Sequence, residues 1–137
     1  MHYFSMTFFS DRLLGEYPLY DVSVRMWDPN DYNNVPQNVD FEELIKKDRN
    51  FNLGNVSPHQ ARTLGRITLP GSDNKDFALS IAARNGFVTE LIKLRKVDGK
   101  WKAAYKVTKD EGKGEPKVLF EQIESRFPLN ENGQVQW

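Results

Sequence analysis

The stretch from Phe77 to Thr108, FALSIAARNGFVTELIKLRKVDGKWKAAYKVT, decides the fold of this chain. It contains the dipeptides Asn85-Gly86 and Asp98-Gly99, and each stands between two runs of alternating side chains. Both dipeptides favour the type I′ turn, because its two central residues need positive φ angles. Two tight hairpins in series therefore predict a three-stranded antiparallel meander.

Two-residue turns also predict how these strands pair. Arg84 is expected opposite Phe87 in the first hairpin, and Val97 opposite Lys100 in the second. With this register, one face of the meander is apolar apart from two charged residues. Its members are Phe77, Leu79, Ile81, Ala83, Val88, Glu90, Ile92, Leu94, Lys96, Trp101, Ala103, Tyr105 and Val107. A slip of one residue would mix the two faces, so the sorting supports the predicted pairing.

Further strands are predicted on both sides of the meander. Alternation from Tyr20 to Met26 indicates a half-buried strand. Thr63–Leu69 reads as another strand, which Gly65 either weakens or interrupts with a bulge, and Val118–Ile123 reads as the last. One helix is expected to begin at Asp40, which can cap it. The fold class is therefore mainly β: an antiparallel β-sandwich or open barrel with one short helix.

Length and composition place the chain among ordinary globular domains. Its 137 residues, 39% of them hydrophobic, fit one β-rich domain over residues 17–137. Residues 1–16 are expected to dock on that domain or to face a partner. Phe4, Phe8 and Phe9 also fit one face of a short helix. No run approaches the ~18 apolar residues that cross a bilayer, so we expect a soluble chain without a transmembrane span.

Cysteine and charge exclude several classes of site and function. With no cysteine, the chain cannot form disulfides, zinc–cysteine sites, iron–sulfur clusters or a cysteine nucleophile. Lys and Arg number 19, and so do Asp and Glu, which argues against a general polyanion binder. We therefore do not expect nucleic acid as a partner.

The neutral total nevertheless conceals a local basic excess. Residues 91–117 hold nine basic and four acidic side chains. Five of the basic residues project from one side of the predicted meander and form what we call the basic face: Lys93, Arg95, Lys100, Lys102 and Lys106. Such a face suits an acidic protein surface, phosphate or an anionic membrane surface. The alternative is a solvated sheet face that lysines protect from aggregation.

A second candidate site lies where the strand ending near Trp27 runs into an Asn-rich loop. Trp27 falls on the polar side of that strand, and Tyr32 follows in the loop. An exposed Trp often marks a contact with sugar or protein, although this ring could equally cover the helix. Asp28, Asn30 and Asp31 could offer oxygens to calcium, but the EF-hand spacing is missing. An Asx turn is the favoured interpretation of these residues.

Candidates for catalysis are few. His59 is one of only two histidines, and no Gly-x-Ser-x-Gly motif accompanies it. Glu90 stands out because the register places it on the apolar face. There it must pair with a basic group, lie near water at the sheet edge, or be protonated. We assign no catalytic residue, no metal ligand and no cofactor.

Several runs resemble uncharacterised bacterial β-rich domains. They are Tyr17–Arg25, Ala83–Gly86, Leu94–Trp101, Ala104–Val107, Phe127-Pro128 and Gly133–Trp137. The resemblance covers about half of the chain. It implies a β-rich fold that is often attached to other segments in a longer protein, and it implies no activity.

These observations favour a non-enzymatic β-domain. We expect it to bind a protein partner through the basic face or the loop that carries Trp27 and Tyr32. One alternative is a small hydrolase that uses His59 or Glu90. The other is a carbohydrate-binding module centred on Trp27.

Overall fold

A computed structural model describes residues 3–10, 18–30, 48–84 and 86–137 of the chain. Almost all of the regular secondary structure in this part is strand. In chain order they are β1 (Tyr3–Phe9), β2 (Leu19–Trp27), β3 (Arg49–Val56), β4 (Ala61–Thr68), β5 (Asn74–Ala83), β6 (Gly86–Val97), β7 (Lys100–Lys109) and β8 (Lys117–Ile123). The predicted mainly β fold is confirmed. The expected helix at Asp40, Tyr32 and the predicted domain boundary at residues 16–17 lie outside the described residues.

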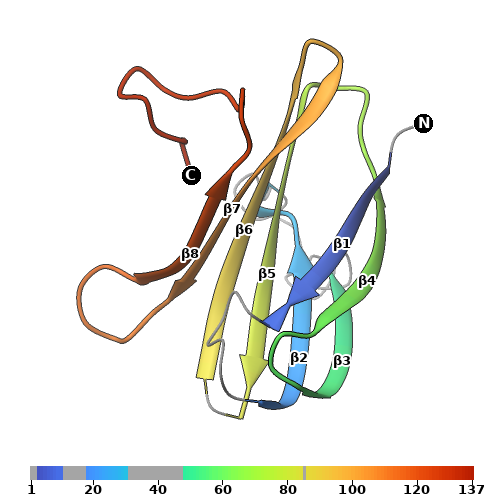
Figure 1. Cartoon of the computed structure of the whole chain (residues 1–137), viewed down its shortest axis with the longest axis vertical. Coiled ribbons are helices and arrows are strands. Elements are labelled where there is room, and N and C mark those ends of the chain that lie inside the picture. The colour runs from blue at the N-terminus through green and yellow to red at the C-terminus, as the bar shows by residue number, and fades with distance from the viewer. Residues whose placement is uncertain (1–2, 11–17, 31–47, 85) are drawn as a thin grey trace, which may run out of the picture.

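The strands form two antiparallel sheets that pack face to face (Figure 1). The larger sheet has six strands in the order β3-β2-β5-β6-β7-β8, and the smaller pairs β1 with β4. In the described part of the chain the two sheets share no strand pairing, so the arrangement is sandwich-like rather than a closed barrel. Among these residues, none of the helical stretches has the length and apolarity needed to traverse a bilayer.

The second hairpin of the meander has the predicted register. Val97 pairs with Lys100, and Leu94 pairs with Ala103. Asp98 and Gly99 have φ angles of 50° and 80°, as a type I′ turn requires. Local turn chemistry therefore sets the pairing of β6 with β7.

The first hairpin pairs differently from the prediction. Ala83 lies opposite Gly86 and Ile81 opposite Val88, so Arg84 does not pair with Phe87. Instead the Arg84 amide donates to the Tyr20 carbonyl oxygen over 2.9 Å, which ties this corner to β2. The register shift amounts to two residues along one strand, and side chains alternate with a period of two. The predicted sorting of the faces therefore survives.

The apolar face of the meander is the core of the sandwich, as predicted. Leu79, Ile81, Ile92, Leu94 and Val107 on it are buried. On the opposite side of the core, Met6 and Phe8 of β1 are each 1% exposed and belong to the same cluster. Because Tyr3–Phe9 form a strand, the interpretation of this segment as a short helix is wrong.

Two features of the larger sheet were not foreseen. β2 has a bulge at Asp21, whose φ is 53°, so that Leu19 and Val22 both point inward and Tyr20 is exposed. β3 was not predicted as a strand. Its run of asparagines with Gly54 lacks a strong apolar alternation, and it forms an edge of the sheet.

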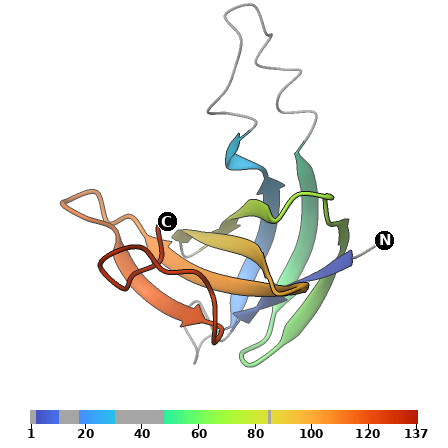
Figure 2. The same ribbon diagram turned by 90° about the horizontal axis from the view of Figure 1, so that it is seen from above.

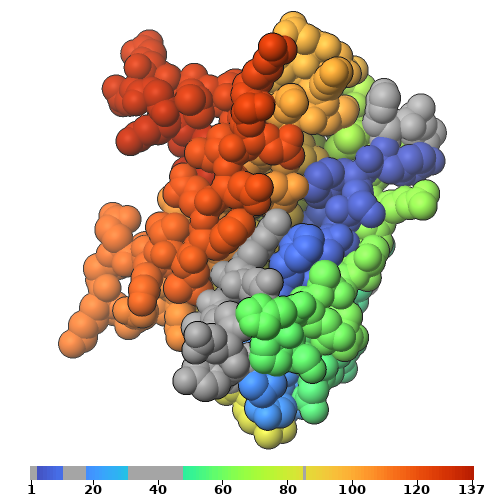
Figure 3. Space-filling model, in the orientation of Figure 1, coloured from blue at the N-terminus to red at the C-terminus, as the bar shows by residue number. Residues whose placement is uncertain are grey.

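The outer face of the larger sheet, which points away from β1 and β4, carries the predicted basic residues. After β8, the C-terminal segment (residues 124–137) returns along the β7 and β8 end of the sheet, far from β3 (Figure 2). Phe127 and Val135 of this segment pack on Ala104 of β7 and make a second, smaller apolar cluster. The C-terminal segment and the β7 and β8 end of the sheet form a continuous surface in the space-filling view (Figure 3). Part of the predicted basic face is therefore covered by the chain itself.

Candidate functional site

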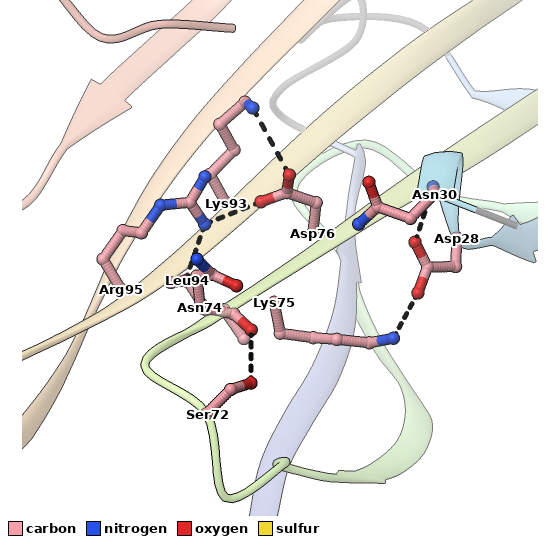
Figure 4. Close-up of polar contacts among 9 residues, drawn as sticks. All are labelled: Asp28, Asn30, Ser72, Asn74, Lys75, Asp76, Lys93, Leu94 and Arg95. Atoms are coloured by element: carbon pink, nitrogen blue, oxygen red, sulfur yellow. Dashed lines mark hydrogen bonds and ion pairs between the residues drawn. The ribbon is translucent and has the colours of Figure 1, made fainter. Parts of the chain in front are cut away.

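Two of the predicted basic residues converge on one carboxylate of the outer face. Lys93 of β6 lies directly opposite Asp76 of β5, and its Nζ is 3.5 Å from the Asp76 carboxylate. Arg95, one side-chain position further along β6, brings Nη1 within 2.7 Å of the other carboxylate oxygen. Figure 4 shows both side chains reaching Asp76 from the same side. Two cations thus share a single anion.

This cluster is partly removed from water. The side chains of Lys93, Arg95 and Asp76 are 15%, 24% and 22% exposed. Lys102 of β7 lies directly opposite Arg95 and adds a third positive charge beside the pair. Like charges in register repel each other, and charges interact more strongly where water is partly excluded. The cluster therefore has an unbalanced positive charge that an external anion would relieve.

The C-terminal segment builds the facing wall of a cleft. Its turn is held by the Asn130 side chain, which accepts hydrogen bonds from the amides of Asn132 and Gln134 at 2.9 and 3.1 Å. Between this segment and the sheet lies a hollow of about 470 Å³. We call it the outer cleft and define it by the residues that line it: Asn30, Asp76, Lys93, Arg95, Phe127, Pro128, Leu129, Asn130, Gln136 and Trp137.

The outer cleft combines three kinds of surface. Its floor carries the Lys93–Asp76–Arg95 cluster, its wall carries Trp137 and the half-exposed Leu129, and amide side chains from both sides complete the rim. A charged group beside apolar surface suits a ligand that has a carboxylate next to an apolar side chain. The outer cleft can therefore recognise an acidic and partly apolar segment.

The other two residues of the basic face that do not adjoin Asp76 or Arg95, Lys100 and Lys106, lie in different surroundings. Lys106 lies with its Nζ 5.5 Å from the centre of the Trp137 ring, and it pairs across the sheet with Glu121 of β8. Lys100 is exposed at the start of β7. The basic face is thus not one uniform patch, because positive charge is concentrated at Lys93, Arg95 and Lys102.

Trp27 lies on the outer face, as expected, but its ring is not freely open. The indole Nε1 donates to the Ser80 hydroxyl over 2.9 Å, and the Arg25 guanidinium lies 5.6 Å from the ring centre. Trp27 is half-buried. An aromatic ring that is held by its own sheet offers less stacking surface to a sugar than the carbohydrate-binding hypothesis assumes. Next to it, Asp28 accepts a hydrogen bond from the Asn30 amide at 2.9 Å, which is the expected Asx turn.

The two catalytic candidates lie far from the outer cleft in the fold. Glu90 is 2% exposed on the core face, where it pairs in register with Leu79 and Val107. His59 is exposed in the turn between β3 and β4, with a φ of 59°. The Ser10 hydroxyl stabilises this connection, because it contacts the carbonyl oxygens of Ser57 and Gln60, each at 3.1 Å. Among the described residues, no cluster of three or more His, Asp or Glu could hold a metal ion.

Comparisons with known proteins add no relative. Neither family models, nor curated proteins, nor solved structures match this chain. The resemblance to bacterial β-rich domains therefore stays a prediction.

Sequence reasoning missed the wall of the outer cleft. Trp137, Leu129 and Asn130 contribute to it, yet no pattern in residues 124–137 predicts a strand or helix that could be placed on a face. The available signal was the apolar spacing of Phe127, Val135 and Trp137 directly after the last strand. An irregular segment with three large apolar residues must bury them, and the nearest uncovered surface was the outer face.

Proposed function

We propose that this β-domain binds a protein partner and that the outer cleft takes an acidic, partly apolar segment of that partner. The observation that carries the proposal is the sharing of Asp76 by Lys93 and Arg95, with Lys102 close by, in a partly buried position. An incoming carboxylate would supply the missing negative charge. A hydrogen bond in which one group is charged is about twice as strong as one between neutral groups.

The apolar wall supports a protein partner over a simple ion. Aromatic side chains and arginine are enriched at the centres of protein interfaces, where they form most of the energetic anchors. Trp137 and Arg95 lie on the same cleft, and Leu129 is 51% exposed beside them. A partner segment that places an apolar side chain against this wall would bury that surface.

The distribution of charge argues against nucleic acid. Lys106 faces Glu121 across the sheet, and the net charge of the whole chain is zero. Nucleic-acid binding draws on many phosphate contacts along an extended basic surface. Here the positive charge of the outer face is concentrated at Lys93, Arg95 and Lys102, which suits a ligand with one or two carboxylates.

A peptide titration tests the proposal. The probes are a capped tetrapeptide Glu-Leu-Phe-Glu and its neutral counterpart Gln-Leu-Phe-Gln, titrated into the full chain by calorimetry, with amide NMR shifts to locate binding. We expect the acidic peptide to bind at residues of the outer cleft. Arg95→Gln is expected to weaken it about tenfold, or ~1.4 kcal/mol.

Lys113→Gln is the matched control, because it removes the same charge from an exposed position in the loop between β7 and β8. It should leave the affinity unchanged. Equal binding of the two peptides, or equal loss in the two variants, would contradict the proposal.

A further inference from the structure

A second hollow lies at one end of the sandwich, where β2 and β4 end and β3 and β5 begin. Its volume is about 430 Å³. We call it the end cleft, and the lining residues that matter here are Met26, Arg49, Arg66, Ile67, Lys75 and Phe77. Along β5, Lys75 belongs to the end cleft and the next residue, Asp76, to the outer cleft. Figure 4 shows these two side chains pointing apart.

The end cleft carries more positive than negative charge. Lys75 pairs with Asp28, which also lies at the lining, and so is neutralised locally. Neither Arg49 nor Arg66 forms an ion pair with any carboxylate of the described residues. Within the described part of the chain, two guanidinium charges therefore remain uncompensated around this hollow.

The Arg49 guanidinium is held in place before any ligand arrives. Its Nη1 donates to the Arg66 carbonyl oxygen over 3.2 Å, and its central carbon lies 5.5 Å from the centre of the Phe51 ring. Gly65 makes room for it, because a Cβ at that position would lie 3.1 Å from Nη2. A side chain that is already ordered loses less entropy on binding, and the planar guanidinium matches the oxygens of an anion.

Apolar side chains from both sheets line the same hollow. Met26 and Phe77 of the larger sheet and Ile67 of the smaller sheet contribute, and Lys75 lies 5.2 Å from the centre of the Phe77 ring. The hollow thus offers apolar surface beside two uncompensated guanidinium groups. This arrangement suits an organic molecule that carries a compact anionic group.

We propose that the end cleft binds a small phosphate monoester, with the phosphate at Arg49 and Arg66 and the organic group towards Ile67 and Phe77. An excess of two positive charges matches a phosphate monoester, which has nearly two negative charges at neutral pH. A carboxylate would neutralise only half of this excess. The proposal does not depend on the outer cleft, since the two sites share none of the residues on which either argument rests.

Phenyl phosphate is the probe, and it is titrated into the full chain by calorimetry with NMR detection of the Phe77 backbone N–H. We expect saturable binding that shifts this signal. Arg49→Gln and Arg66→Gln are each expected to weaken it about tenfold or more, because each removes a charge-assisted contact. Arg66 is exposed, so its variant is expected to fold normally even if Arg49→Gln perturbs β3.

Arg62→Gln is the matched control. Arg62 lies at the other end of β4, where its side chain contacts the Asn55 carbonyl oxygen at 3.5 Å. Phenyl phosphate should bind this variant as it binds the parent chain, and benzoate should bind the parent more weakly than phenyl phosphate does. Absence of saturable binding, equal loss in Arg62→Gln, or equal affinity for benzoate would overturn the proposal.

Discussion

At the scale of single residues, Asp76 decides the charge of the outer cleft. Its carboxylate forms ion pairs with both Lys93 and Arg95. Its partial burial keeps both cations oriented towards the cleft, and it offsets one of their two charges. Asp76 therefore holds the cationic side chains in position and at the same time competes with any incoming acidic group.

Replacing Asp76 separates these two effects. We expect Asp76→Asn to strengthen binding of the peptide Glu-Leu-Phe-Glu by about three- to tenfold, because both cations then lack their internal anion. The free energy of unfolding should fall by only ~0.5–1 kcal/mol, since the side chains are partly exposed and screened. Calorimetry and urea denaturation measure the two quantities.

Asp73→Asn is the control for this change, because Asp73 is exposed in the turn before β5. It removes the same charge and should alter neither quantity. Weaker peptide binding by Asp76→Asn would mean that the carboxylate itself contacts the ligand, which the proposed charge balance does not allow.

At the scale of elements, the C-terminal segment is a separate layer on the outer face. It is joined to the sheet by the Glu124 amide, which donates to the Ala103 carbonyl oxygen, and by the packing of Phe127 and Val135 on Ala104. This cluster is distinct from the main core. A small apolar contact area makes such a segment able to open while the sandwich stays folded.

Phe127→Ala tests whether the wall of the outer cleft opens independently. Phe127 is 6% exposed, so its truncation should lower the free energy of opening of the C-terminal segment by ~2–3 kcal/mol through lost apolar burial. We expect faster hydrogen exchange at the Asn130 amide, which donates to the Gln134 carbonyl oxygen, and weaker peptide binding. Exchange at Leu79 in the main core should not change.

The neighbouring Leu129→Ala is the matched control, since Leu129 is 51% exposed and supports no cluster. It should leave exchange at Asn130 as in the parent chain. If Phe127→Ala accelerates exchange equally at Leu79 and Asn130, the segment and the sandwich unfold as one unit and the interpretation of a separate layer is wrong.

At the scale of the whole molecule, β1 completes the sandwich although it lies at the start of the sequence. Its Met6 and Phe8 cover the core face of the larger sheet, together with Leu64 of β4. Among the described residues the smaller sheet consists of β1 and β4, so the core loses part of its cover when β1 does not pack. Both clefts are built on the frame that this packing stabilises.

Phe8 and Phe9 allow a direct test of whether β1 packs as a core strand. Phe8 is 1% exposed and Phe9 is 37% exposed, although they are neighbours of the same type. We expect Phe8→Ala to lower the free energy of unfolding by ~3–5 kcal/mol through loss of burial and formation of a cavity. Phe9→Ala should lower it by less than ~1.5 kcal/mol. Urea denaturation distinguishes the two, and equal losses would contradict the packing of β1 as a core strand.

The sequence alone determined the features that depend on neighbouring residues. The turn at Asp98-Gly99, the strands that follow from alternation and the sorting of the meander into a core face and an outer face were all predicted correctly. Positive φ angles and the period of two along a strand are properties of a few consecutive residues. Lys93 and Arg95 could be placed on one face for the same reason.

Only the tertiary structure decided how distant segments meet. Arg84 leaves the predicted register because its amide binds Tyr20, 64 positions earlier in the chain, and its guanidinium binds Asp21 over 2.9 Å. In the same way Phe127 and Trp137 cover an outer face that the sequence left open, and Asp76 becomes the shared partner of two cations. These contacts depend on which surfaces remain uncovered once the sheets have packed, and residue spacing within one segment carries no such information.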